Sequence, residues 1–279
     1  MQKNSNSYIF IFAITVSVAA SVLLALASTA LKPRKQIAVK LDVVKNILSV
    51  SGLSDEQIKS KKDTDILAMY EKDFATVLLD RDNRQVKRED LEKNLLTIGY
   101  KKEDLDQLYT FELISLFNKK LGIMAGKAGK SKTDFDPGYK SLFLYQPGGE
   151  LKSYIIPIEG NGLWGMMYGY IALQPDLNTV TGVRFYKHQE TPGLGGEAEK
   201  PWFTGQYVGK KILSDDGSFR SIDVFKGKSA DVYSGDELNY YVDGISGATI
   251  TSKAIANFMK EDLEKFEEYF RQIRKGGNQ

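Results

Sequence analysis

The chain has 279 residues, of which 42% are apolar and 27% charged, so it can bury a hydrophobic core as one large or two small domains. Its 38 basic and 36 acidic side chains nearly cancel, which argues against a basic face for nucleic acid. With no cysteine and a single histidine, His188, the sequence excludes disulfides, cysteine-held clusters and multi-histidine metal sites, and redox chemistry would need an organic cofactor.

The first predicted element is a membrane-spanning helix at residues 8–31, after a short tail at residues 1–7. The run YIFIFAITVSVAASVLLALASTAL has no charged residue, proline or glycine, and a helix of this length crosses a hydrocarbon core of about 30 Å. A cleaved signal peptide is the alternative, because Ala25, Ala27 and Ala30 offer small-residue cleavage patterns. The apolar run is longer than the ~7 to 15 residues of a signal sequence, so we predict an uncleaved single-pass anchor in membrane lipid.

Basic residues around this span argue for a cytoplasmic domain. One lysine precedes the span, whereas several basic residues follow it, namely Lys32, Arg34, Lys35 and Lys40. The positive-inside rule then places the rest of the chain in the cytoplasm, although the rule weakens when a long domain is exported.

Helices are predicted from the span to residue 139. Apolar residues at helical spacing in residues 32–54, ending at a Ser-Gly pair, predict a juxtamembrane helix. Residues 55–139 are charged and helix-rich, which indicates a small solvated helical subdomain or insertion. Near the end of this segment, MAGKAGKSKTDFDPG is rich in glycine and lysine and predicts a loop.

The sequence from residue 140 to 279 predicts a sheet followed by a long helix. Short apolar or alternating runs bounded by glycine indicate strands and hairpins, namely LFLYQ, SYIIPIEG, GMMYGYIALQ, TVTGVRFYK, QYVGKKIL, SIDVFKG and DVYSGDELNYYVDGIS. An apolar stripe at helical spacing predicts a helix from Thr251 to Lys275. The predicted fold class is α+β, a mainly antiparallel sheet with flanking helices, preceded by one N-terminal transmembrane helix.

The stretch DGISGATITSKAIANFM, residues 243–259, places small and hydroxylated residues directly before that helix. A helix N-terminus has free backbone N–H groups and the positive end of the helix dipole. Glycines let the backbone approach a ligand, and hydroxyls are offered by Ser246, Thr249, Thr251 and Ser252. Local physics leaves two interpretations open, a phosphate site and an ordinary helix cap.

Two other segments combine glycines with tryptophan. GNGLWGMMYGYIAL contains Trp164, and HQETPGLGGEAEKPWF contains Glu190, Thr191 and Trp202. Each alone is compatible with a turn that packs an aromatic residue. Together they indicate loops that close over a flat ring, with backbone donors for its polar edge and an aromatic or leucine side chain against its face.

These motifs resemble those of a known family. DGISGAT is similar to the flavinylation signature Asp-x-x-Ser-Gly-Ala-Thr, on whose final threonine a dedicated flavin transferase places FMN through a phosphoester; that threonine is Thr249 here. GLWG, NTVTG and HQETPGLG, in this order and spacing, look like the NqrC family of the Na⁺-translocating NADH:quinone reductase, as does KNILSVSGL after the span. The resemblance covers the anchor and the region from about residue 142 onward, and it is less clear over residues 55–139.

The resemblance implies that residues 140–279 are an FMN-binding domain with covalent FMN on Thr249. Small residues before it would let the transferase reach its hydroxyl, namely Ser246, Gly247 and Ala248. The residues implied around the flavin ring are Leu163, Trp164, Glu190, Thr191, Gly193 and Leu194, with Gly193 and Gly195 setting the turn. No catalytic residue, metal ligand or sodium-handling group is implied within this chain.

The resemblance also implies a location and partners. The chain would be anchored in the bacterial inner membrane with its large C-terminal domain in the periplasm, contrary to the count of basic residues. As one part of the sodium-translocating enzyme, it would relay single electrons from an iron–sulfur centre elsewhere in the complex to the flavin of NqrB, a further member of the complex. NADH and quinone would bind other subunits.

Two alternatives stay open at this point. RnfG, the corresponding flavoprotein of an Rnf-type electron-transport complex, shares the flavinylation motif, although HQETPGLG together with GLWG favours the sodium pump. The second alternative is a membrane-anchored binding module without redox chemistry. A native protein that is unmodified and colourless would support it.

Overall fold

A computed structural model describes residues 6–106, 108–127, 129 and 138–276. The chain divides into two compact units, residues 1–45 and residues 46–279. Most of the Gly/Lys-rich segment predicted as a loop, and most of the predicted N-terminal tail, lie outside the described residues.

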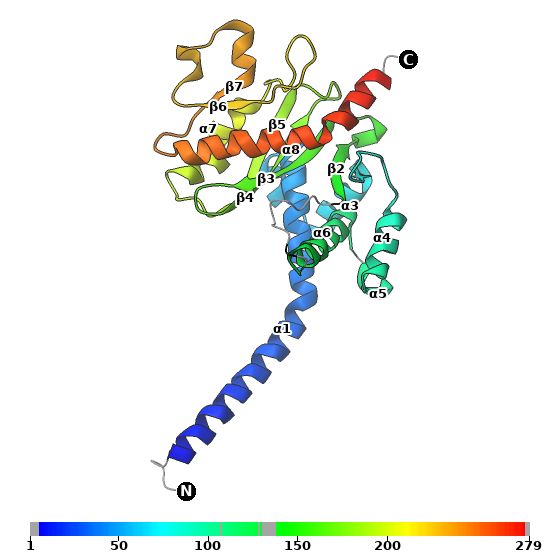
Figure 1. Ribbon diagram of the computed structural model, residues 1–279, viewed down its shortest axis with the longest axis vertical. Helices are drawn as coiled ribbons and strands as arrows, with labels where there is room; N and C mark the ends of the chain where they lie inside the picture. The colour runs from blue at the N-terminus through cyan, green and yellow to red at the C-terminus, as the bar shows by residue number, and fades with distance from the viewer. Residues whose placement is uncertain (1–5, 107, 128, 130–137, 277–279) are drawn as a thin grey trace. The chain divides into compact units, whose positions relative to one another are not determined.

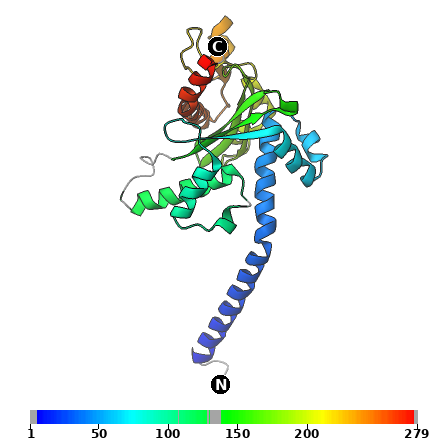
Figure 2. The same cartoon turned by 90° about the vertical axis from the view of Figure 1, so that its right-hand side faces the viewer.

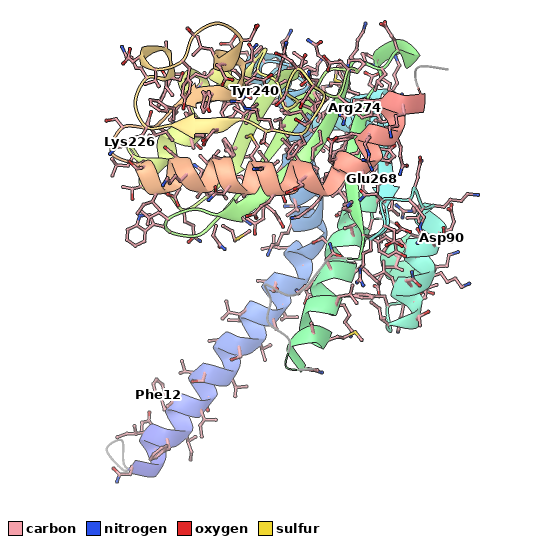
Figure 3. The ribbon with its side chains drawn as sticks, turned by 45° about the horizontal axis from the view of Figure 1, so that its top comes forward. Phe12, Asp90, Lys226, Tyr240, Glu268 and Arg274 are labelled. Atoms are coloured by element: carbon pink, nitrogen blue, oxygen red, sulfur yellow. The ribbon has the colours of Figure 1, made fainter. Side chains whose placement is uncertain are left out.

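The first unit is formed by helix α1, Asn6–Val50, whose last turn belongs to the second unit. Its stretch Tyr8–Leu31 has 24 residues with a mean hydropathy of 2.7 and no buried residue, and Phe12 within it is 60% exposed (Figure 3). Length and composition therefore make this stretch a candidate membrane anchor. The helix ends where the Ser-Gly pair predicts, since Gly52 adopts φ +108° and Leu53 N–H bonds back to the Leu48 carbonyl.

The second unit is built on a five-stranded sheet in the order β1-β2-β3-β4-β5, with every neighbouring pair antiparallel (Figure 1). The strands are β1 Phe74–Leu79, β2 Lys140–Tyr145, β3 Ser153–Asn161, β4 Met166–Leu173 and β5 Val180–Lys187. A two-stranded parallel sheet is formed by β6 Asp223–Phe225 and β7 Tyr241–Asp243. The predicted α+β class with a mainly antiparallel sheet is confirmed.

Helices and short turns complete the unit. The α-helices are α2 Asp55–Lys59, α3 Asp63–Asp73, α4 Arg88–Thr97, α5 Lys102–Leu105, α6 Thr110–Lys127, α7 Pro201–Thr204 and α8 Thr249–Gly276. The 3₁₀ turns are η2 Pro147–Gly149, η3 Gly195–Glu199, η4 Gly205–Tyr207, η5 Ser229–Asp231 and η6 Gly235–Tyr240.

Three predictions for this region need revision. The run DVYSGDELNYYVDGIS, predicted as strands or hairpins, contains only the short strand β7, because 3₁₀ turns precede it and Gly235 adopts φ +58°. The run QYVGKKIL, predicted as a strand, is instead a 3₁₀ turn and a loop, because Gly209 adopts φ +81° and interrupts the extended backbone. The segment 55–139 is helical as predicted, but it also contains β1, which the sequence analysis did not anticipate.

The sheet buries a hydrophobic cluster on each face. Strand β1 shows this, since Val77 and Leu79 join the cluster under α8 while Leu78 joins the cluster of α4 and α6. Helix α8 covers its face with a stripe of buried residues, which includes Ile255, Phe258, Met259, Leu263, Phe266 and Phe270. Figure 2 shows α8 and the α6 region on opposite sides of the sheet.

A buried carboxylate fixes α8 along strand β3. Asp262 is 5% exposed, and its Oδ2 accepts the Glu159 N–H at 2.6 Å while its Oδ1 accepts the Lys265 ammonium at 2.7 Å. Glu159 lies near the end of β3, directly before the loop that carries Trp164. The contact therefore holds the middle of α8 against the last residues of β3.

Candidate functional site

Glu190 joins the segments that the sequence predicts to form a site. It is 5% exposed, its Oε1 accepts the Trp164 N–H at 2.9 Å, and its Oε2 accepts the Thr251 hydroxyl at 2.5 Å. These bonds connect the β3–β4 loop, the loop after β5 and the first turn of α8. A buried carboxyl group needs such donors, so its contacts hold the loops together as one unit.

The backbone passes so close to the Glu190 side chain that only glycine fits at two neighbouring positions. A β-carbon on Gly162 would lie 2.5 Å from Glu190 Oε1, and one on Gly195 would lie 2.5 Å from Oε2. Gly247 adopts φ +74°, and a β-carbon there would lie 2.8 Å from the Leu194 side chain. The small residues before α8 therefore have a partly structural role, because larger side chains would push the loops apart.

The loop after β5 is held by a compact set of hydrogen bonds. The Thr191 carbonyl accepts the N–H groups of Leu194 at 3.1 Å and Gly196 at 2.9 Å, and Gly193 between them adopts φ +76°. Gly193 thus provides the left-handed turn, whereas Gly195 is needed for close packing. Leu194 is left 42% exposed on this turn.

His188 supports this loop from its N-terminal side. Its Nδ1 accepts the Glu190 N–H at 3.2 Å, and its Nε2 lies 3.5 Å from Glu199 Oε2. The hydrogen bond from Lys200, aided by the charge of that lysine and opposed by desolvation, holds the pKa of Glu199 below its ordinary value. His188 is therefore a hydrogen-bonded support of the loop.

The hydroxyls at the start of α8 have different roles. Thr251 is 1% exposed and donates to Glu190, and the Ser252 hydroxyl accepts the Ile245 N–H at 3.1 Å. Ser246 and Thr249 are exposed. The prediction that all these hydroxyls could contact a ligand is therefore too broad, because Thr251 and Ser252 are used inside the fold.

Exposed apolar side chains gather on the segments that meet at Glu190. Their exposed fractions are 46% for Leu163, 64% for Trp164, 42% for Leu194 and 61% for Ile250. Trp202, 48% exposed, is oriented by a 2.9 Å hydrogen bond from its Nε1 to Glu197 Oε2. Large apolar side chains left in water on adjoining loops are typical of a ligand or partner surface.

The structure brings the loops of Trp164 and Glu190 together with the first turn of α8, and there Thr251 has an internal bonding role that the sequence did not predict. The position of Thr251 was detectable, since it precedes Ile255 and Phe258 at helical spacing and so lies on the buried stripe of α8. Its partner was not detectable, because Glu190 lies 61 residues away in the chain. Among the described residues, no cluster of three or more His, Asp or Glu side chains could hold a metal ion.

Residues 162–264 match the model of the FMN-binding domain family, and this range contains every residue of the site. Over 261 residues, the chain is 31% identical to NqrC, the C subunit of the Na⁺-translocating NADH-quinone reductase, of Pseudomonas aeruginosa, covering 92% of each. The chain belongs to the NqrC family. The resemblance stated from the motifs is thus confirmed, and the chain is part of an oxidoreductase complex and contains an FMN-binding domain.

Other members of the NqrC family agree. The relative from Haemophilus ducreyi is 32% identical over 86% of this chain and 82% of its own length. The crystal structure of NqrC from Shewanella oneidensis superimposes with a TM-score of 0.62 at 25% identity, covering 85% of this chain and 99% of that one. The corresponding protein from Parabacteroides distasonis, with a TM-score of 0.60 at 24% identity, shows the same fold and covers 86% of this chain and 96% of its own.

Proposed function

We propose that this NqrC protein carries FMN covalently on Thr249 and relays electrons within the sodium-translocating NADH-quinone reductase. The observation that supports Thr249 is the contrast within the first turn of α8. Its side chain is exposed at the first helical residue, whereas the neighbouring threonine, Thr251, is buried and bonded to Glu190. Only an exposed hydroxyl can be reached by a flavin transferase.

The residues around Thr249 fit the FMN group. The first N–H groups of α8 have no intrahelical acceptor, and with the positive helix dipole they would stabilise a phosphodiester on Thr249. The exposed side chains of Leu163, Trp164, Leu194 and Ile250 offer apolar area for a flat ring. FMN, when bound, supplies the redox chemistry, while Glu190 holds the loops that receive it.

Anchoring and orientation complete the proposal. Residues 8–31 anchor the chain in the inner membrane, and the FMN-binding domain, residues 140–279, lies in the periplasm, where a covalent bond prevents loss of the cofactor. The electron donor is an iron–sulfur centre of the complex and the acceptor is the flavin of another subunit. The partners are then the other subunits, the flavin transferase and membrane lipid.

The acceptor assignment is tested by removing single hydroxyls in a host that expresses the flavin transferase. Thr249→Val keeps the β-branched shape, and loss of a cap costs only about 0.5–2 kcal/mol, so the variant should fold but show no fluorescent band on a denaturing gel and no added FMN mass. Ser246→Ala removes the other exposed hydroxyl and Thr251→Val the buried one, and both should keep the flavin. A Thr249→Val protein that still carries FMN would show that the acceptor is another residue.

A further inference from the structure

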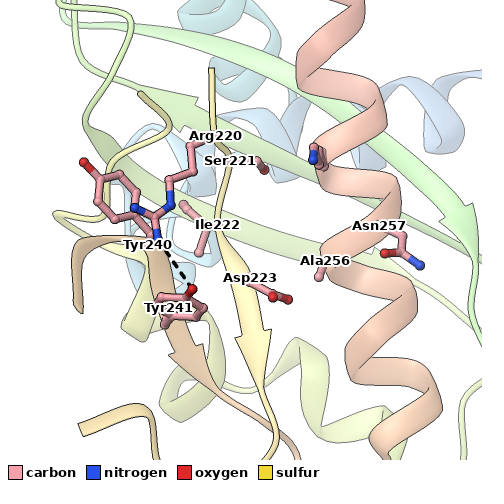
Figure 4. Close-up of a pocket in the computed structure, with 9 residues that line it drawn as sticks. Arg220, Ser221, Ile222, Asp223, Tyr240, Tyr241, Ala256 and Asn257 are labelled. Carbon is pink, nitrogen blue, oxygen red and sulfur yellow. Dashed lines mark hydrogen bonds between the residues drawn. The ribbon is translucent and has the colours of Figure 1, made fainter. Parts of the chain in front are cut away.

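A pocket of about 260 Å³ lies outside the flavin site, between the segment from Arg220 to Asp223 and the middle of α8 (Figure 4). Its lining residues are Arg220, Ser221, Ile222, Asp223, Tyr240, Tyr241, Ala256, Asn257 and Lys260. None of them contributes to the cluster around Glu190. A pocket of this volume has room for several water molecules or for a small organic ligand.

Ser221 carries two unfavourable features at once. Its backbone adopts φ +70°, a left-handed conformation that is unfavourable for a residue with a β-carbon. Its side chain is 4% exposed, and the hydroxyl has no hydrogen-bond partner in the described part of the chain. Figure 4 shows this side chain directed from its segment toward α8. Strain and an unpaired buried donor at one pocket residue are typical of a ligand-binding position.

The guanidinium of Arg220 is paired with Glu237 and also donates to the Tyr241 hydroxyl. It donates to both carboxylate oxygens of Glu237, at 3.1 and 2.6 Å, and lies 4.0 Å above the ring of Tyr240. The Tyr240 hydroxyl in turn donates to the Leu213 carbonyl at 3.1 Å. Arg220 therefore lines one side of the pocket. Its positive charge is balanced by Glu237, so a ligand would find no net charge there.

The charges left for a ligand have opposite signs. Lys260 is exposed and makes no ion pair with any residue that the structure describes. Asp223 uses Oδ1 to accept the Val224 N–H at 2.7 Å, which leaves its second oxygen for another donor. Asn257 adds an exposed side-chain amide that can both donate and accept. The pocket thus offers one cation, one carboxylate and a buried hydroxyl.

We propose that this pocket binds a small carboxylate that carries a hydrogen-bond donor on the adjacent carbon, that is, an α-hydroxy or α-amino acid. The ligand carboxylate accepts from the Lys260 ammonium and the Ser221 hydroxyl, and the neighbouring hydroxyl or ammonium donates to Asp223. A ligand with only a negative charge would be repelled by the Asp223 carboxylate, and one with only a positive charge would be repelled by the Lys260 ammonium. The inference does not depend on the flavin, because no pocket residue belongs to that site.

The proposal is tested by calorimetric titration of the full-length protein in detergent. Lactate and serine are the probes, and propionate is the matched control because it is lactate without the hydroxyl. We expect one-site binding of lactate or serine, at least about tenfold tighter than propionate or inorganic phosphate. Tight binding of lactate shows that a hydroxyl next to the ligand carboxylate is sufficient, whereas binding of serine alone shows that an ammonium is needed there.

Variants identify the pocket as the site. Lys260→Met, on the surface of α8, should weaken binding of the preferred probe at least about tenfold, and so should Ser221→Gly, which removes the hydroxyl but tolerates the positive φ. Lys253→Met, an exposed lysine on the same helix outside the pocket, should leave affinity unchanged. The proposal is overturned if wild-type protein binds neither probe, if propionate or phosphate binds equally well, or if Lys260→Met binds normally.

Discussion

Replacing Glu190 by alanine is expected to lower the stability of the second unit by about 3 kcal/mol. The change removes the acceptor of the Trp164 N–H and of the Thr251 hydroxyl. An unpaired buried donor costs about 1–3 kcal/mol. The bond from the Trp164 backbone N–H is only partly buried, so the cost there lies near the lower limit, whereas Thr251 is 1% exposed and its cost lies nearer the upper one.

This loss should be visible in thermal unfolding followed by far-ultraviolet circular dichroism. For a unit of this size, 1 kcal/mol corresponds to about 2–4 °C in Tm, so Glu190→Ala should unfold about 6–12 °C below the wild type. Glu190→Gln keeps an oxygen for the Trp164 N–H and an amide that can bond the Thr251 hydroxyl. Its loss should stay below about 1 kcal/mol, or about 4 °C.

Glu150→Gln serves as the control, because Glu150 forms an ion pair with Lys152 while 73% of its own side chain is exposed. Such a surface pair contributes at most about 1 kcal/mol. The interpretation of Glu190 as the centre that joins the loops is refuted if the alanine variant unfolds within about 2 °C of the wild type, or if glutamine is as destabilising as alanine.

Three further outcomes are expected. Trp164→Ala should keep covalent FMN by mass but shift the visible absorbance or midpoint potential of the flavin; a change in stability alone would mean that this tryptophan only packs the loop. Burial, opposed by Lys265, raises the pKa of Asp262 above the ordinary value of 3.8, so its ionised form costs stability at neutral pH and this cost is relieved as pH falls through the folded pKa. Wild type should therefore gain stability relative to Asp262→Asn between pH 7 and pH 4 in urea titrations, and parallel curves would contradict the assignment. Alkaline phosphatase fused after Gln279 should be active if the domain is periplasmic, whereas an inactive fusion with a fluorescent cytoplasmic reporter would support the count of basic residues.

The sequence determined those features that depend on neighbouring residues. An uncharged run of membrane length, the helical stripe of α8 and the glycines before it are all local patterns, and composition and periodicity predict them. The order and spacing of GLWG, HQETPGLG and DGISGAT were sufficient to indicate the NqrC family and the segments of its site.

Tertiary structure decided which of these residues touch. Strand β1 lies among charged helices in the sequence, yet Phe74 pairs with Tyr145 of β2, a partner that no local pattern specifies. The same reason explains why the hydrogen-bond partner of Thr251 could not be identified until Glu190 was placed. Hydrogen bonds and β-pairings between distant segments depend on how the whole chain folds, because each partner alone is compatible with many neighbours.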